Sequence, residues 1–327
     1  MLNYIAKRFL NLLILVTLAS TLGYFLAAST LDPRTNFKGR NPPVLESTID
    51  LKLDELNAND KDPVVTRYFR WVGGVLQGDL GLTMQDTPVN DEMGRRIFVS
   101  LRLLIIGSIL GSVLGVLFGV LSAVRQYKLF DRLFGTFSYL VLSTPVFLTA
   151  ILLKYVAINL NQRAGTTIFY TVGEYSPEFV GGGWDLILNR MQHLILPTLS
   201  IALGGMAFYS RYQRNSMLDV LSSDYLRTAR AKGLTKRDAL FKHGLRVAIL
   251  PLTTFFAYSF GLLITGAAFT ETIFGWNGMG QWFINGVQGN DINVTAAVIL
   301  FSAVLVLISG FIADVVTVAL DPRVRLR

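Results

Sequence analysis

Few side chains in this 327-residue sequence have the type and spacing that catalysis or metal binding needs. The chain has no cysteine, which excludes disulfides and thiolate metal sites. Its two histidines, His193 and His243, lie far apart in the sequence and do not predict a metal site or a histidine-based catalytic site. His193 starts an apolar block, and we interpret it as a structural or interfacial residue. No Walker-type G-x-x-x-x-G-K-S/T motif occurs, so ATP chemistry is not expected in this chain.

The segment Ser222–Pro251, SSDYLRTARAKGLTKRDALFKHGLRVAILP, has instead the chemistry of a protein-docking surface. It is basic and predicts two short helices. The first helix is preceded by N-cap residue types and then places apolar residues on one face. The N-cap candidates are Ser222, Ser223 and Asp224, and the face consists of Tyr225, Leu226 and Ala229.

A hinge and a second helix follow. Gly233 stands where a helix C-terminus favours a left-handed residue. Thr235 with Asp238 three residues later is close to a capping box, and a helix is expected through Ala239 toward Arg246. A loop that is basic only to set membrane topology would not need two capped helices and a glycine, so docking is the favoured interpretation.

Six long apolar blocks surround this segment and make the chain 52% hydrophobic and 16% charged. Each block is about 20 residues long, the length that a helix needs to cross the hydrocarbon of a bilayer. Backbone groups in lipid must pair within their own segment, so we expect six transmembrane helices. The blocks are Phe9–Leu31, Leu103–Val124, Leu133–Leu153, Met191–Ser210, Val247–Thr270 and Ile292–Ala313. The predicted fold class is therefore an all-α polytopic membrane protein.

The second block carries Gly107, Gly111, Gly115 and Gly119, four residues apart. Small residues at this spacing let another helix approach closely, so they predict a packing face. The first block follows Lys7 and Arg8 but is longer than a signal-peptide core. We expect it to be a retained span.

Lys and Arg gather on one side of a six-span arrangement, which predicts that both chain ends are cytoplasmic. Residues 211–246 contain nine Lys/Arg against three Asp, whereas the last outer loop, at Asn290-Asp291, has neither Lys nor Arg. The other basic positions on the inner side are Lys7, Arg8, Arg125, Lys128, Arg132, Arg323, Arg325 and Arg327. This bias accounts for most of the net charge of +8, so nucleic-acid binding is not expected.

The layout has three parts. Residues 1–31 form the N-terminus and first span, and residues 32–96 form an extracytoplasmic segment that we expect to pack on the membrane part. Residues 97–327 form a core of five spans with the cytoplasmic loop 211–246. The charged residues Arg102, Lys154, Glu271 and Asp314 lie near span ends, where snorkelling or helix capping explains them.

Tyr225–Arg246 resembles the cytoplasmic EAA loop of binding-protein-dependent ABC transporter permeases. Arg227, Thr228 and Ala229 align with its start, Gly233 follows four residues after Ala229, and Leu245 matches its later leucine. Arg227 and Thr228 replace the family's Glu and first Ala, a departure that fits the peptide/nickel branch. RYFRWVGGVLQGDLGLTM (Arg67–Met84), ETIFGWNGMGQWF (Glu271–Phe283) and ALDPRVR (Ala319–Arg325) are similar to other segments of oligopeptide and dipeptide permeases.

The resemblance implies a type I ABC importer permease in the bacterial inner membrane, with no cofactor of its own. Its partners would be a second homologous permease, two cytoplasmic ATPases that bind ATP and Mg, and an extracytoplasmic peptide-binding protein. The implied ATPase-coupling residues are Asp224, Tyr225, Leu226, Arg227, Thr228, Ala229, Lys232, Gly233 and Leu245, with apolar contact by Tyr225 and Leu226. The implied gate or docking residues are Glu271, Trp276, Asn277, Gly278 and Gly280.

Three alternatives stay open at this point. Nickel, glutathione or another small solute could replace peptides as the substrate within the same branch. An ion-coupled secondary transporter would need ionisable groups in mid-span, and an intramembrane enzyme would need paired catalytic groups there. The apolar blocks show neither pattern.

Overall fold

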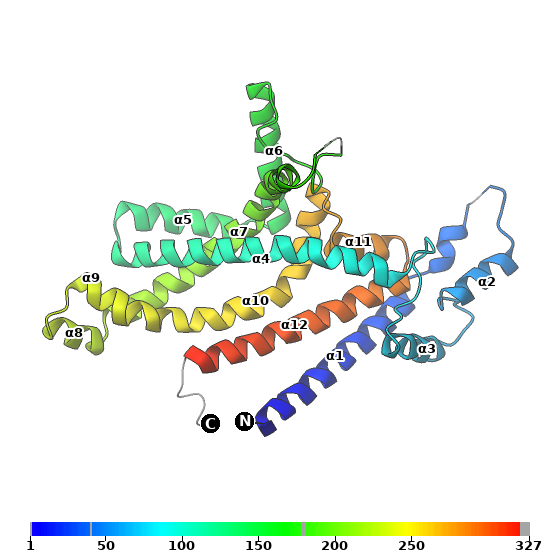
Figure 1. The fold of residues 1–327 in the computed structure, drawn as a ribbon, viewed down its shortest axis with the longest axis horizontal. Helices are drawn as coiled ribbons and strands as arrows, with labels where there is room; N and C mark the ends of the chain where they lie inside the picture. The colour runs from blue at the N-terminus through cyan, green and yellow to red at the C-terminus, as the bar shows by residue number, and fades with distance from the viewer. Residues whose placement is uncertain (1, 40, 178, 180, 321–327) are drawn as a thin grey trace. The chain divides into compact units, whose positions relative to one another are not determined.

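The computed structural model describes residues 2–39, 41–177, 179 and 181–320, with side chains described except at 2–9, 253–254, 257–266 and 313–320. The chain is helical throughout this part, apart from loops and one isolated β-bridge between Leu82 and Pro88. Figure 1 shows the arrangement. The helices are α1 (Leu2–Thr30), α2 (Glu46–Glu55), α3 (Val64–Leu76), α4 (Val89–Val124), α5 (Leu129–Ser143), α6 (Val146–Ala164), α7 (Trp184–Leu221), α8 (Asp224–Ala231), α9 (Lys236–Ala239), α10 (Leu245–Phe274), α11 (Met279–Gln288) and α12 (Ile292–Leu320), with a 3-10 turn η1 (Pro33–Phe37) and a π-turn η2 (Leu240–Gly244).

Among the described residues, four helices are long and apolar enough to cross a membrane. They are Leu10–Thr30, Val89–Val124, Trp184–Leu221 and Ile292–Ile312, and the pair α5 and α6 makes a fifth if it is one span. The all-helical membrane prediction is therefore confirmed. The finer count of six spans is not reached within the described residues, because part of α10 lies outside the described side chains.

The third apolar block is not the single helix that its length predicts. The chain bends by 109° between α5 and α6, and Thr144 at the break has an extended backbone (φ −92°, ψ 124°). Pro145 explains the break, because proline lacks an N–H for the helix ladder and pushes the preceding residue out of the α region. Figure 1 shows α6 turning away from α5 at this point.

The chain divides into two compact units, and α4 and α12 contribute to both. The first unit comprises residues 1–100 and 277–308. In it the segment after α1 folds back on α1, as expected for residues 32–96. Tyr24 of α1 stacks on Trp71 of α3 with ring centroids 5.0 Å apart, and the surrounding core also takes in Leu53 of α2 and Ile292 and Ala296 of α12.

Arg34 links η1, α2 and the loop after α2, which together form the outer part of the first unit (residues 33–62). The guanidinium of Arg34 in η1 donates hydrogen bonds to Glu46 and Asp50 of α2 and to Asp60 in the following loop, at 2.7–2.8 Å. Hydrogen bonding to Arg34 lowers the pKa of the Asp60 carboxyl. Hydrogen bonding to Lys61, and then to Arg34, lowers the pKa of Asp50 in the same way.

The second unit comprises residues 101–276 and 309–327, and the glycine face of α4 packs in it against α7 as predicted. A methyl group at Gly111 would lie 2.9 Å from the Ala202 carbonyl oxygen, and one at Gly119 would lie 2.6 Å from the Ser210 carbonyl oxygen. Both distances are shorter than a carbon–oxygen contact allows. Glycine is therefore needed for the two backbones to lie this close.

Candidate functional site

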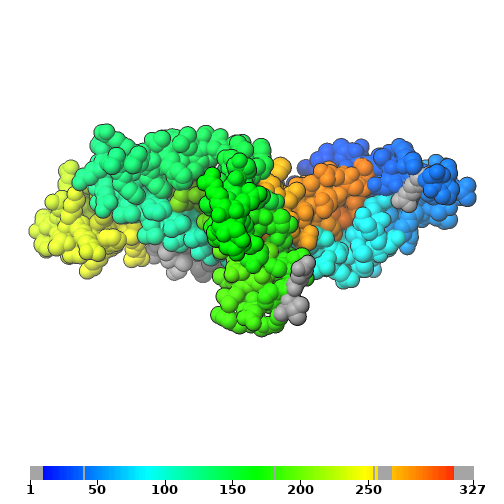
Figure 2. All heavy atoms as spheres, turned by 90° about the horizontal axis from the view of Figure 1, so that it is seen from above, coloured from blue at the N-terminus to red at the C-terminus, as the bar shows by residue number. Residues whose placement is uncertain are grey.

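The predicted docking segment, residues 222–246 (the coupling segment), forms α8 as expected, whereas the expected second helix is α-helical only over Lys236–Ala239 and continues as the π-turn η2. It lies at one end of α7 and α10, and Figure 2 shows it as an exposed yellow end of the second unit. Gly233 has φ +93°, and the Leu234 N–H donates to the Ala229 carbonyl at 3.3 Å, as in a helix that ends on a left-handed glycine. Thr235 Oγ1 accepts from the Asp238 N–H at 3.1 Å, so the predicted cap of the second helix is confirmed.

The start of α8 differs from the prediction. Ser223 occupies the N-cap position, but its side chain makes no capping bond and donates instead to the Val220 carbonyl at 2.6 Å. The Ser222 hydroxyl likewise donates backward, to the Asp219 carbonyl. Both serines therefore satisfy carbonyls at the end of α7, and Asp224 is the first residue of α8.

One side of the coupling segment is buried against its own chain. Leu226 is 5% exposed and packs with Ala239 and Leu240 on Met217 and Val220 of α7. Partly buried Ala229 and Leu245 pack against the same cluster. The Leu226 side chain therefore holds α8 on α7, and its expected contact with another subunit stays a prediction.

The other side of the coupling segment is free to meet a partner. Tyr225 is 43% exposed, and a side chain added at Gly233 would meet no atom within 4 Å. Basic groups outnumber acidic groups on this surface. Its exposed members are Ser222, Asp224, Tyr225, Arg227, Thr228, Arg230, Ala231, Lys232, Gly233, Thr235, Lys236, Arg237, Asp238, Phe241, Lys242, His243 and Arg246.

A π-turn joins the coupling segment to the membrane helix that follows it. η2 (Leu240–Gly244) continues without a break into α10, and a methyl group at Gly244 would lie 3.0 Å from Val220. Sequence reasoning missed Gly244 as a close-approach glycine, although its place between two helical runs is a signal for one. The continuous backbone gives the coupling segment a direct mechanical connection to α10.

The second predicted site, at the far end of α10, is mostly buried. Glu271 is fully buried, Trp276 is 1% exposed, and Gly278 and Gly280 are buried as well. Only Asn277 is exposed. The Trp276 side chain is buried in this chain, and its expected contact with another protein stays a prediction.

Charged side chains surround this end of α10. The Arg102 guanidinium donates to Glu174 at 2.7 Å and lies 5.4 Å from the centre of the Trp276 ring. Lys154 of α6 donates to the Ile273 carbonyl at 2.5 Å. An ammonium on one of the last carbonyls of a helix satisfies an acceptor that the helix leaves unpaired, so Lys154 caps α10. Capping was one of the two explanations, with snorkelling, that the sequence offered for this residue.

The loop at Val172 and Gly173 is hydrogen-bonded to the same end of α10. The Gly173 N–H donates to the Phe274 carbonyl at 2.8 Å, and His193 of α7 holds the loop through its Nδ1, which lies 3.1 and 3.0 Å from the Val172 and Gly173 carbonyls. Carbonyls only accept, so Nδ1 carries the proton. His193 is 3% exposed, and its predicted structural role is confirmed.

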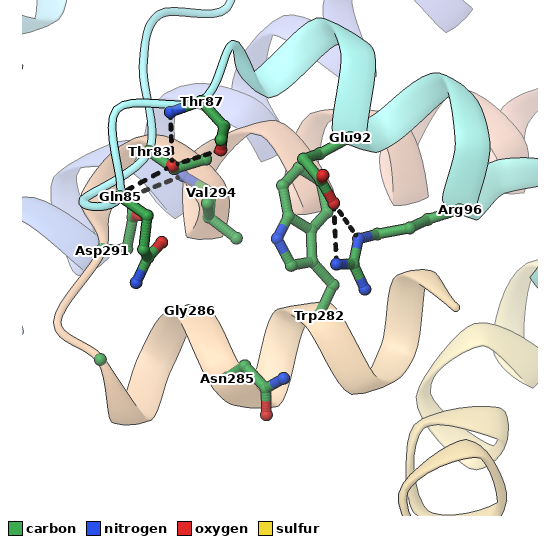
Figure 3. Close-up of a pocket in the computed structure, with 11 residues that line it drawn as sticks. Thr83, Gln85, Thr87, Glu92, Arg96, Trp282, Asn285, Gly286, Asp291 and Val294 are labelled. Carbon is green, nitrogen blue, oxygen red and sulfur yellow. Dashed lines mark hydrogen bonds and ion pairs between the residues drawn. The ribbon is translucent and has the colours of Figure 1, made fainter. Parts of the chain in front are cut away.

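The first unit contains a separate polar pocket of about 340 Å³, drawn in Figure 3. Glu92 and Arg96 of α4 pair on one side of it at 2.9 Å, and the Trp282 ring of α11 lies 5.3 Å from the Arg96 guanidinium. Asp291, at the start of α12, accepts from the Met84 and Val294 N–H groups. Burial raises the pKa of the Asp291 carboxyl.

These arrangements offer binding surfaces. In the part of the chain that the structure describes, no group of three or more His, Cys, Asp and Glu side chains could hold a metal ion. The predictions for Asp314, Lys7 and Arg8 rest on side chains outside the described residues. The predicted inner-side residues Arg323, Arg325 and Arg327, and residues 321–325 of the ALDPRVR match, also lie outside them.

Comparison with known proteins identifies the family to which the chain belongs. Residues 115–326 match the family described as binding-protein-dependent transport system inner membrane component. The chain is 49% identical over 325 residues to the oligopeptide transport system permease protein OppB of Mycobacterium tuberculosis, covering 99% of each chain. It is 34% identical to AppB, the oligopeptide transport system permease protein of Bacillus subtilis (98% of each), and 32% identical to the glutathione transport system permease protein GsiC of Escherichia coli (99% of each). The chain therefore belongs to the family of binding-protein-dependent transport system inner membrane components.

Proposed function

We propose that this chain is a permease subunit of an ATP-driven importer of oligopeptides. The observation that carries the proposal is the 49% identity over 99% of the chain to an oligopeptide permease. Glutathione is the second candidate substrate, because a glutathione permease is 32% identical over the same length. The permease itself would be non-catalytic, with ATP and Mg held by partner subunits.

Membership of the family supports the proposed partners. A binding protein would deliver substrate on the outer side, a second homologous permease would supply the other half of the pathway, and two ATPases would dock on the inner side. We propose six spans, with α10 and the bent pair α5–α6 completing the set of candidates, and both chain ends in the cytoplasm.

The exposed side of the coupling segment would be the ATPase contact. Tyr225, Arg227, Thr228, Lys232 and Gly233 lie at its surface, whereas Leu226, Ala229 and Leu245 anchor it from behind. Exposed ion pairs are worth only about 0–1 kcal/mol each, so shape and the Tyr225 ring would contribute more than the charges. A push on α8 would reach α10 through α9 and η2, and would bias a rigid-body change between two arrangements of the spans.

We keep the far end of α10 as a candidate outer gate. Glu271 and Trp276 are buried there, and α6, α4 and the loop at Gly173 hold this helix end by the contacts of Lys154, Arg102 and Glu174. A gate residue needs no exposed surface in the closed arrangement. Asn277 stays a candidate contact for the binding protein because it is exposed.

The test is ATP-dependent uptake by the complete complex in proteoliposomes, supplied with its binding protein and with labelled peptides, glutathione or nickel ions in separate assays. Peptide uptake that competes only with other peptides is the expected result. Uptake of glutathione or nickel with no uptake of peptides would replace the proposed substrate. Uptake driven by an ion gradient in the absence of ATP would overturn the importer class.

A further inference from the structure

The second unit has a cavity of about 550 Å³ between α5 and α7 that no part of the proposed transport cycle uses. It lies toward the N-terminus of α5 and the C-terminal half of α7. Three arginines line it, Arg132 from α5 and Arg211 and Arg214 from α7. The carboxylate in its lining is Asp131.

Asp131 is already paired. Its two carboxylate oxygens accept from Arg214 Nε and Nη2 at 2.7 and 2.9 Å, and the Tyr127 N–H donates to it at 2.9 Å. The carboxylate side chain is 6% exposed. This forked pair neutralises Arg214 and leaves Asp131 with little capacity to balance a further charge.

The other two arginines have no carboxylate within ion-pair distance among the described residues. The Arg211 guanidinium lies over the Tyr139 ring, 4.0 Å from its centre, and donates to the Tyr139 hydroxyl at 3.2 Å. Arg132 is exposed beside the cavity. Two unbalanced guanidinium groups around one hollow predict an anionic ligand, and guanidinium matches the oxygens of a phosphate well.

The side chains around the cavity indicate what kind of molecule carries this phosphate. The same helix that carries Arg132 exposes large apolar side chains, with Leu129 72%, Leu133 63% and Leu140 62% exposed. In a membrane component such side chains contact hydrocarbon. A basic cavity beside them stands at the boundary between headgroups and acyl chains, where pockets between membrane helices bind anionic lipid headgroups.

We propose that this cavity binds the headgroup phosphate of an anionic phospholipid, with Arg132 and Arg211 as ligands and acyl chains along α5. The proposal does not rest on the transported substrate. It requires only that the chain is an inner membrane component.

The experiment uses the full-length chain in detergent, titrated with phosphatidylglycerol or phosphatidylcholine and followed by native mass spectrometry. Phosphatidylglycerol should bind in preference to phosphatidylcholine. The single changes Arg132→Gln and Arg211→Gln should each weaken its binding about fivefold, and the double variant roughly twenty- to thirtyfold. The control double variant Arg230→Gln/Lys236→Gln removes the same charge from the exposed coupling segment and should keep the preference.

Two further measurements distinguish a lipid phosphate from free inorganic phosphate and provide a variant that keeps the charge. Arg211→Lys keeps the charge but loses the forked guanidinium, so it should bind with intermediate affinity. This variant tests the site even if the double variant does not fold. Excess inorganic phosphate should not displace the lipid. Equal binding of the two lipids, an unchanged preference in the arginine variants, or displacement by inorganic phosphate alone would each overturn the proposal.

Discussion

Gly119 of α4 lies so close to Ser210 of α7 that a methyl group on Gly119 would stand 2.6 Å from the Ser210 carbonyl oxygen. The same methyl would be 2.7 Å from Gln213 Cβ and 3.1 Å from the Arg214 nitrogen. Backbone atoms of a neighbouring helix cannot move aside as a flexible side chain can. The packing of α4 on α7 therefore depends on the absence of a side chain at this position.

The first prediction concerns this contact. Gly119→Ala should destabilise the chain by about 1–3 kcal/mol, because the added methyl forces α4 and α7 apart. The measurement is thermal unfolding of the purified protein in detergent. Gly94→Ala is the matched control on the same helix, since a methyl there meets nothing within 4 Å. It should leave stability unchanged or raise it, and equal losses in the two variants would contradict the packing argument.

The second prediction separates the two sides of the coupling segment. Leu226→Ala should loosen α8 from α7 at a local cost of about 2–5 kcal/mol, because it leaves a cavity in a buried cluster. Hydrogen exchange of residues 222–246 would rise, and ATP-driven uptake would fall with it. Tyr225→Ala should change exchange little but weaken binding of the ATPase subunits. The coupling role fails if both variants keep full uptake.

The third prediction concerns orientation. The chain has no cysteine, so single cysteines at Arg163 and Lys232, both exposed, can be labelled without background. A membrane-impermeant maleimide added to intact cells should label Arg163→Cys and not Lys232→Cys. Labelling of Lys232→Cys should appear only after the membrane is opened. The reverse pattern would place the coupling segment outside and remove the proposed ATPase contact.

The fourth prediction is a pH dependence in the outer part of the first unit. The pKa of Asp60 and that of Asp50 are lowered in the folded chain, so their ion pairs contribute fully above the ordinary carboxylate pKa of about 4. That stabilisation is lost as the pH falls through the lowered values. Hydrogen exchange of residues 33–62 should therefore rise on acidification below about pH 4.

Arg34→Gln should show the raised exchange already at neutral pH and a smaller further change in acid. Arg70→Gln removes an exposed pair with Asp62 in the same region and serves as the control. Exposed ion pairs contribute little to stability, so hydrogen exchange in the Arg70→Gln variant should match that of the unsubstituted protein. An acid response that is the same in the Arg34 and Arg70 variants would show that the Arg34 network does not carry it.

The sequence alone was enough to predict an all-helical membrane protein, the glycine face of α4 and the short helices on either side of Gly233. Charge-free runs of about 20 residues must be helices in lipid, because every backbone N–H and C=O group has to pair within its own segment. The caps around Gly233 and Thr235 are also local, since the interacting atoms lie a few residues apart.

Tertiary packing decides which of these side chains are buried and which are exposed, and residue spacing in the sequence could not predict that. Leu226 and Tyr225 are neighbours in the sequence and both are apolar enough to dock, but α7 covers only Leu226. Trp276 has the residue type of an interfacial anchor, yet Arg102 and its surroundings bury it. Arg211 and Arg132 come together only because α5 packs along α7, and no local pattern records that meeting. A sequence determines which segments enter the membrane, whereas the contacts between distant helices decide which side chains remain free to bind.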